Sequence, residues 1–151
     1  DWNDEGTAML QDALWADGAR LGNADYADIT TRFVAASLEG WMHCRDNSAE
    51  CVEIVLNNGS SLGASHQAWQ MNEINGLIWP SPDGAGVMDE GLWAQTIDVA
   101  TSQGILASAP DSGAYTTEYA EAAVEMLKNR GVDTTGKNWR RVDVTLNLGG
   151  E

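Results

Sequence analysis

The sequence predicts a helix-rich α/β fold with about five helices and one or two short strands. Apolar residues recur at spacings of three and four in several separate stretches, the pattern of amphipathic helices. Near the C-terminal end, residues 142–148 alternate strictly between apolar and polar side chains, the pattern of a strand with one buried face. A strand needs a pairing partner and the chain offers few others, so we expect part of a sheet to lie outside these 151 residues.

The secondary structure of the N-terminal stretch stays undecided. Residues 1–21 open with an acidic turn that contains a glycine. Leu10 and Leu14 then allow a turn of helix, whereas residues 13–16 could equally form a short buried strand. The longest helix begins at residues 22–25, and we expect it to end near His43. Its predicted buried stripe consists of Tyr26, Ile29, Phe33, Ala36, Leu38 and Trp41.

The chain is predicted to turn a corner between Cys44 and Cys51, which are seven residues apart. On one straight helix this separation is a rise of about 10 Å, too far for a disulfide, whose Cα atoms lie within about 7 Å. Asn47, with Glu50 three residues later, resembles a capping box and predicts a new helix start. The break brings a disulfide within reach, and two free buried thiols are the alternative. A disulfide would favour a location outside the cytoplasm.

A short helix over residues 48–57 and a loop over residues 60–63 follow the corner. The next helix begins at His66. Pro80 excludes the helical conformation at the residue before it and Pro82 prevents a restart, so this helix ends there. Its wide predicted buried face consists of Trp69, Met71, Ile74, Leu77 and Ile78.

Two more helices follow a glycine-rich turn at residues 83–86. Asp89 caps the first of them, which stops at Gly104. After a connector, the last helix covers about residues 116–130 and ends at Gly131. The core-facing residues are predicted to be Leu92, Trp93, Ile97 and Ala100 in the first and Tyr119, Ala123, Met126 and Leu127 in the second.

Composition excludes several classes of function. The chain has 23 acidic and 8 basic residues, a net charge of -15, which repels phosphate backbones and anionic lipid surfaces. No stretch approaches the roughly 18 apolar residues of a membrane span. The acidic residues 1–5 are followed by no apolar h-region, so we expect these residues not to be a signal peptide. Because the chain begins with Asp1 and not with methionine, we expect an upstream portion to be missing. The seven tryptophans offer large apolar faces with a polar N–H, which suit carbohydrate-like or heteroaromatic ligands, although most tryptophans in proteins are core residues.

No set of residues indicates catalysis, a metal site or a cofactor site. His43 and Cys44 are neighbours on a helix and point about 100° apart, so neither can orient the other as a nucleophile pair. His66 and Gln70 share a helix face, but no further residue completes a metal site. The glycines of residues 83–86 lack the lysine of a phosphate-binding loop. We therefore expect a protein that is not an enzyme and that carries no metal or cofactor.

Six runs of residues, in order along the chain, carry a family resemblance: 36–41, 44–47, 51–56, 66–73, 77–80 and 113–115. They include the short sequences CVEIVL, HQAWQMNE and LIWP. These runs resemble the C-terminal part of NMT1/THI5-like substrate-binding proteins, which serve ABC importers of nitrate, taurine and pyrimidine precursors. The resemblance covers nearly the whole chain.

The resemblance implies a two-lobed periplasmic-binding-protein fold of type II, in which the ligand lies between two α/β lobes and is delivered to an ABC permease of the inner membrane. Residues 1–21 would then be the end of the second lobe, or the hinge, and the crossing to the first lobe. Residues 22–151 would be the helix-rich C-terminal part of the first lobe. The N-terminal lobe portion would be missing from this chain, and the location would be periplasmic or otherwise extracytoplasmic.

The resemblance also implies a ligand site at Trp2, Asn3, Asp4 and Glu5, in a turn that lines the cleft. Trp2 would stack on a heteroaromatic ring, and Asp4 or Glu5 would accept hydrogen bonds from an aminopyrimidine-like edge. An acidic lining disfavours nitrate and sulfonates. A frayed, solvated terminus is the alternative interpretation of these four residues.

Two other functions remain open at the level of sequence. Relatives of this family synthesise a pyrimidine, an activity associated with a cysteine-rich motif that these residues do not contain. A free-standing acidic helical protein that binds other proteins is the second alternative. Under the resemblance, the stretch from His66 to Pro82 is a structural signature of the family and not the ligand site.

Overall fold

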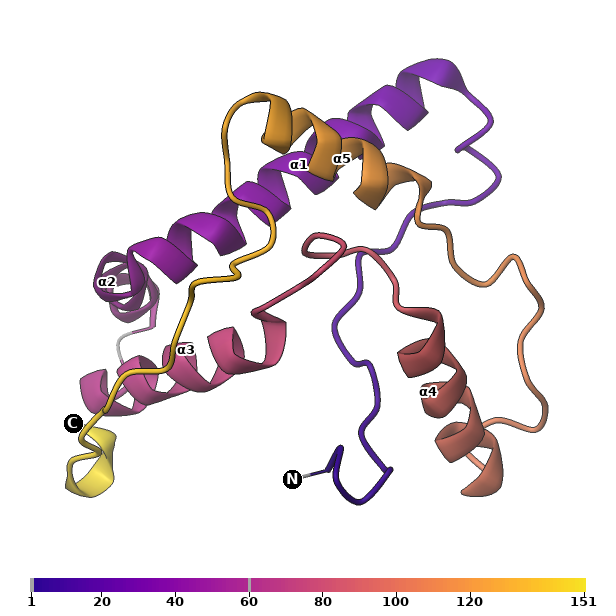
Figure 1. The fold of residues 1–151 in the computed structure, drawn as a ribbon. Helices are drawn as coiled ribbons and strands as arrows, with labels where there is room; N and C mark the ends of the chain where they lie inside the picture. The colour runs from indigo at the N-terminus through magenta and orange to yellow at the C-terminus, as the bar shows by residue number, and fades with distance from the viewer. Residues whose placement is uncertain (1, 60) are drawn as a thin grey trace.

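The structure, a computed structural model, describes residues 2–59 and 61–151, so Asp1 of the predicted turn and Ser60 of the predicted loop lie outside the described residues. Within those residues the secondary structure is entirely helical (Figure 1). The elements are α1 (Ala24–Asp46), α2 (Ser48–Asn58), α3 (Ala64–Ile78), α4 (Glu90–Ser102), α5 (Glu118–Asn129) and the short 3-10 turn η1 (Leu148–Gly150).

The predicted α/β fold is therefore wrong for the part of the chain that the structure describes. Residues 142–147 run alongside α3 without pairing to another strand (Figure 1). The side chain of Asn72 on α3 takes the place of a neighbouring strand at one position. Its Nδ2 donates to the carbonyl of Val142 and its Oδ1 accepts from the amide of Val142, each at 3.0 Å. A sheet ladder requires a second extended segment in register, and side-chain alternation alone does not supply one.

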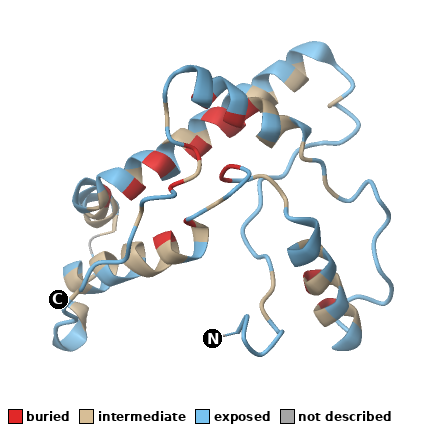
Figure 2. Ribbon diagram, viewed as in Figure 1, coloured by how far each residue is buried: buried red, intermediate tan, exposed pale blue. Residues whose placement is uncertain are grey.

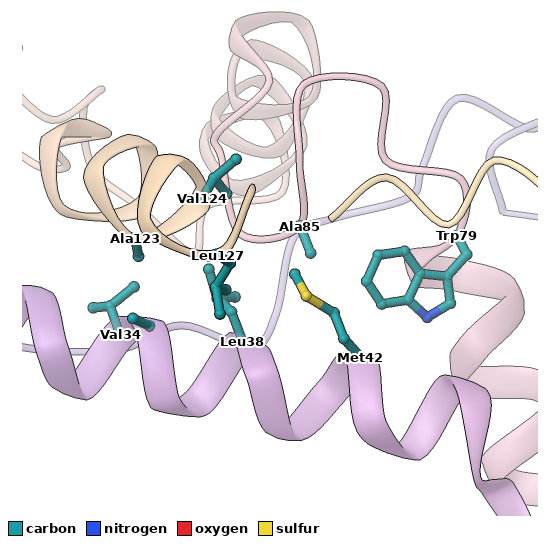
Figure 3. Close-up of a cluster of buried hydrophobic side chains, with 9 residues drawn as sticks. Val34, Leu38, Met42, Trp79, Ala85, Ala123, Val124 and Leu127 are labelled. Carbon is teal, nitrogen blue, oxygen red and sulfur yellow. The ribbon is translucent and has the colours of Figure 1, made fainter. Parts of the chain in front are cut away.

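The core forms where α5 crosses α1 (Figures 1 and 3). Leu127 of α5 has no exposed surface and lies among apolar side chains of α1 such as Leu38 and Met42. Trp79 and Ala85, from the segment after α3, close one end of this cluster (Figure 3). Removing these apolar groups from water is the main force that holds the two helices together.

The buried face of α1 differs from the predicted stripe. Phe33 is 61% exposed, and Ile29 and Ala36 are also exposed, whereas Val34 and Ala35 face α5. The helix carries apolar residues on both faces, and α5 covers only one of them. Spacing along a helix reports that a face is apolar, but the position of the neighbouring helix decides which apolar face is buried.

The α1–α2 corner holds a disulfide between Cys44 and Cys51, with Cα atoms 5.4 Å apart. Asn47 separates the two helices, and its backbone amide donates to the carbonyl of His43 at 2.8 Å. Helix α2 then packs against α3. The wide buried face predicted for α3 is wrong in extent, because Leu77 is 83% exposed and Trp69 is also exposed.

Replacing both cysteines by alanine is expected to lower the free energy of unfolding by about 2 to 3 kcal/mol, the chain-entropy value for a short loop. Urea denaturation followed by circular dichroism should show this loss. A reducing agent should destabilise the unmodified protein by a similar amount and leave the double variant unchanged. Equal stability of the two proteins under oxidising conditions would show that the bridge does not hold the corner.

Helix α4 lies apart from the other helices (Figure 1). Asp89 caps its first turn, as predicted, by accepting a hydrogen bond from the amide of Leu92 at 2.9 Å. The N-terminal segment runs beside it and is tied to it twice. The amide of Leu10 donates to Thr96 Oγ1 at 2.9 Å, and Gln95 Nε2 donates to the carbonyl of Ala8 at 2.8 Å.

Many large apolar side chains remain in contact with solvent, and most of the ribbon in Figure 2 has the colours of exposed or intermediate residues. The most exposed of them occur on the extended N-terminal segment, on α1 and α3, in the connector after α4 and on the C-terminal segment. No helix among residues 2–59 and 61–151 is both long and apolar enough to cross a membrane. The most exposed apolar side chains are Trp2, Leu14, Trp15, Ile29, Phe33, Leu77, Ile105, Val142 and Leu148.

Candidate functional site

The four predicted ligand residues form a turn at the surface. The amides of Thr7 and Ala8 both donate to the carbonyl of Trp2, at 2.9 and 3.1 Å. The amide of Gly6 donates to the carbonyl of Asn3 at 3.0 Å, and Gly6 has a φ of 69°, which glycine adopts without strain. Trp2, Asn3, Asp4 and Glu5 therefore lie in one turn, as expected for this acidic, glycine-containing stretch.

The chemistry of this turn is that of an open, acidic, aromatic surface. The Trp2 side chain is 75% exposed, and Asp4 and Glu5 are exposed beside it. None of these residues lines either of the two hollows described below. An indole face and two carboxylates can stack on a flat ring and accept its N–H groups, but the described chain does not enclose such a ring.

The first hollow lies between α1, α2 and α3 and has a volume of about 180 Å³. Its walls are mainly hydrocarbon, and two glutamines of α3 supply the polar groups. The lining residues are Trp41, Val52, Val55, Gln67, Gln70, Met71 and Ile74. Val52 and Val55 of α2 line this hollow and leave a gap against α3.

The second hollow has a volume of about 400 Å³ and lies between α4 and the connector that follows it. Asp98 is its one charged lining residue, and Trp93 provides its aromatic wall. The helical spacing predicts that Trp93 faces the core, and no local pattern distinguishes Asp98 from other acidic residues. The sequence feature that could have indicated this hollow is the spacing of Trp93, Ile97 and Thr101, which places the three side chains on one face of the helix. The connector supplies Ala109 and Pro110.

A buried arginine, which no local sequence pattern indicates, ties α1 to two distant segments. Arg45 is 7% exposed, and its guanidinium makes two hydrogen bonds to the carboxylate of Asp46, at 2.7 and 2.8 Å. It also donates to the backbone carbonyl of Asp133 at 2.8 Å and lies 4.7 Å from the ring centroid of Trp79. The hydrogen bond to Asp46 raises the pKa of Arg45 above its usual value.

Asp133 organises the turn that this arginine contacts. Its Oδ1 accepts hydrogen bonds from the amides of Thr135 and Gly136, at 2.9 and 3.1 Å. The bond from the Thr135 amide is the main cause that lowers the pKa of the Asp133 carboxyl, and Arg45 adds to it. Trp79 Nε1 donates to the buried Asn75 at 2.9 Å. These contacts give the end of the stretch from His66 to Pro82 a structural role.

The histidines and cysteines have local partners. His43 Nε2 lies 3.4 Å from Glu50, and the neighbouring Cys44 is in the disulfide. The ring of His66 lies 5.7 Å from that of Trp69. Across the described residues, no three His, Cys, Asp or Glu side chains are grouped so that they could hold a metal ion.

Comparisons of the chain with protein-family profiles, with curated proteins and with solved structures find no match.

Proposed function

We propose that this chain is the helical C-terminal portion of a solute-binding receptor of an ABC importer, with a small heteroaromatic, pyrimidine-precursor-like ligand and no catalytic turnover. The observation that carries the proposal is the large number of apolar side chains left in contact with solvent. Leu148 is 99% exposed, and Trp15 and Leu77 are almost as accessible. We take this exposed apolar surface, which is spread over several segments, as surface that the remaining part of the protein covers.

In the complete receptor, the remaining residues of the first lobe would pack against this exposed apolar surface. Residues 1–21 would cross between the lobes, and residues 22–151 would contribute helices to the first lobe. Helix α4 supports this assignment because it contacts the N-terminal segment but lies apart from the other helices. The order of the runs from residue 36 to residue 115 supports the same family.

The acidic turn supports a neutral or cationic heterocycle as the ligand. Trp2 offers a ring face, and Glu5 offers a carboxylate that can accept an exocyclic N–H. A net charge of -15 opposes the approach of nitrate or a sulfonate. The disulfide between Cys44 and Cys51 supports an extracytoplasmic or periplasmic location, where such bonds persist. An ABC permease of the inner membrane is the partner that such a receptor requires.

In the complete receptor, Glu5→Gln is expected to weaken binding of 4-aminopyrimidine by about tenfold to a hundredfold, because a hydrogen bond to a charged acceptor is lost. Isothermal titration calorimetry measures this change. Glu53→Gln, at an exposed position of α2, removes the same charge away from the turn and should leave the affinity unchanged. Tight binding of taurine with no response to 4-aminopyrimidine would contradict the proposed ligand class.

A free-standing acidic helical protein is the second candidate, and the closed core between α1 and α5 favours it. The two candidates differ in how the exposed apolar surface behaves. A free-standing domain should melt in one cooperative transition and bind little of a hydrophobic dye. A receptor portion should bind the dye in its native state and lose that binding when the remaining lobe is present.

A further inference from the structure

The hollow beside α4 combines an aromatic wall, apolar carbons and one carboxylate. We propose that it binds an organic ammonium ion with an aromatic or aliphatic body. This site is separate from the turn at residues 2–6 and does not depend on the proposed receptor function.

The aromatic wall is held in position by a second ring. Trp93 packs on Tyr115 of the connector, with ring centroids 4.8 Å apart and planes at 55°. Ile97 and Thr101 continue the same face of α4, while Gln95 and Thr96 bind the N-terminal segment. The N-terminal segment is therefore attached through other residues of α4 than those that line the hollow.

The charge around the hollow has one sign. Asp98 is exposed, and its carboxylate makes no hydrogen bond or ion pair with any residue in the described part of the chain. No lysine or arginine occurs in residues 46–127, which contain α4 and its connector. Asp111 and Glu90 add further negative charge to this region. The segments that line the hollow therefore bring no basic side chain of their own.

The other lining groups favour an ammonium ion with an apolar body over a metal ion. A single carboxylate supplies too few ligands for Ca²⁺, which takes six or more oxygens. The face of Trp93 attracts a cation through its ring quadrupole and also covers hydrocarbon. The hydroxyl of Thr101 donates to the carbonyl of Ile97 at 2.8 Å, so its oxygen remains an acceptor. A volume of about 400 Å³ lies in the range of small-molecule sites.

Titration of this protein with 2-phenylethylammonium, followed by the indole N–H resonance of Trp93 in NMR spectra, tests the proposal. The variant Trp93→Phe identifies that resonance among the seven tryptophans. We expect a saturable shift with the ammonium ion. The neutral analogue 2-phenylethanol should bind about threefold to fivefold more weakly, the effect of one exposed ion pair. Asp98→Asn should reduce the affinity for the ammonium ion to that for the alcohol.

The control variant Glu125→Gln removes the same charge from an exposed position of α5 and should change the affinity little. Raising the salt concentration should weaken binding of the ammonium ion and leave binding of the alcohol unchanged. Equal affinity for the two compounds, an unchanged affinity in Asp98→Asn, or a Trp93 resonance that does not move would each overturn the proposal. The comparison of the two compounds is made on the unmodified protein once the Trp93 resonance is assigned, so it decides the question even if Asp98→Asn disturbs folding.

Discussion

Leu127→Ala is expected to lower the free energy of unfolding by about 3 to 4 kcal/mol. Leu127 has no exposed surface and lies at the centre of the cluster that joins α5 to α1 (Figure 3). Truncation removes apolar carbons from the core and leaves a cavity, and such changes cost about 2 to 5 kcal/mol. The value should lie in the upper part of this range because α5 has no other large, fully buried side chain to hold it in place.

Urea denaturation followed by circular dichroism measures the effect. Leu77→Ala is the matched control, because it makes the same chemical change at a side chain that is 83% exposed. That variant should stay within about 0.5 kcal/mol of the unmodified protein. Similar losses for the two variants would contradict the placement of the core between α1 and α5.

Arg45→Met is expected to destabilise the protein by about 2 to 4 kcal/mol. The substitution keeps an unbranched apolar side chain but removes the hydrogen bond to the carbonyl of Asp133, worth about 1.5 to 3 kcal/mol for a charged donor. It also removes the cation above Trp79, worth about 0.5 to 2 kcal/mol. The carboxylate of Asp46 is more than half exposed, so water can solvate it after the change, which limits the loss.

The matched control is Arg130→Met, since Arg130 also makes two hydrogen bonds to a carboxylate, that of Glu39, but at an exposed site. Its loss should be much smaller, because exposed ion pairs contribute little to stability. Thermal and urea denaturation of both variants provide the comparison. A larger effect at Arg130 than at Arg45 would contradict the role given to the buried arginine.

The helices could be predicted from the sequence because their ends carry local signals. Asn23 accepts a hydrogen bond from the amide of Tyr26 at 3.0 Å, and the predicted start of the longest helix, at residues 22–25, agrees with α1. Asp89 caps α4 in the same way. Helix α3 ends before Trp79, the residue that Pro80 removes from the helical conformation. The end of α1 was placed near His43 and lies at Asp46.

The remaining features depend on contacts between segments far apart in the chain. Alternation at residues 142–148 predicted a strand, but the neighbour of Val142 is the side chain of Asn72, and no local pattern indicates that pairing. In the sequence, nothing distinguishes Arg45 from other charged residues. Its contacts with Asp133 and Trp79 form only in the folded chain. Asp98 likewise lines a hollow only because the connector folds back beside α4.

The candidate ligand turn was predicted as a group of residues, and the structure places those residues in one turn. The cleft that would enclose a ligand there is built from two lobes and was predicted only through the family resemblance. A turn is a local structure, whereas an enclosing cleft requires surface from elements distant in sequence. The sequence could therefore indicate the chemistry of Trp2 and Glu5 but not that both side chains are exposed.

The central proposal is that this chain is the C-terminal portion of a two-lobed solute-binding receptor. Sequencing the gene upstream of the codon for Asp1 is its most direct test. The proposal predicts that the reading frame continues upstream into a lobe with alternating strands and helices, preceded by a signal peptide. A start codon immediately before the codon for Asp1 would contradict it.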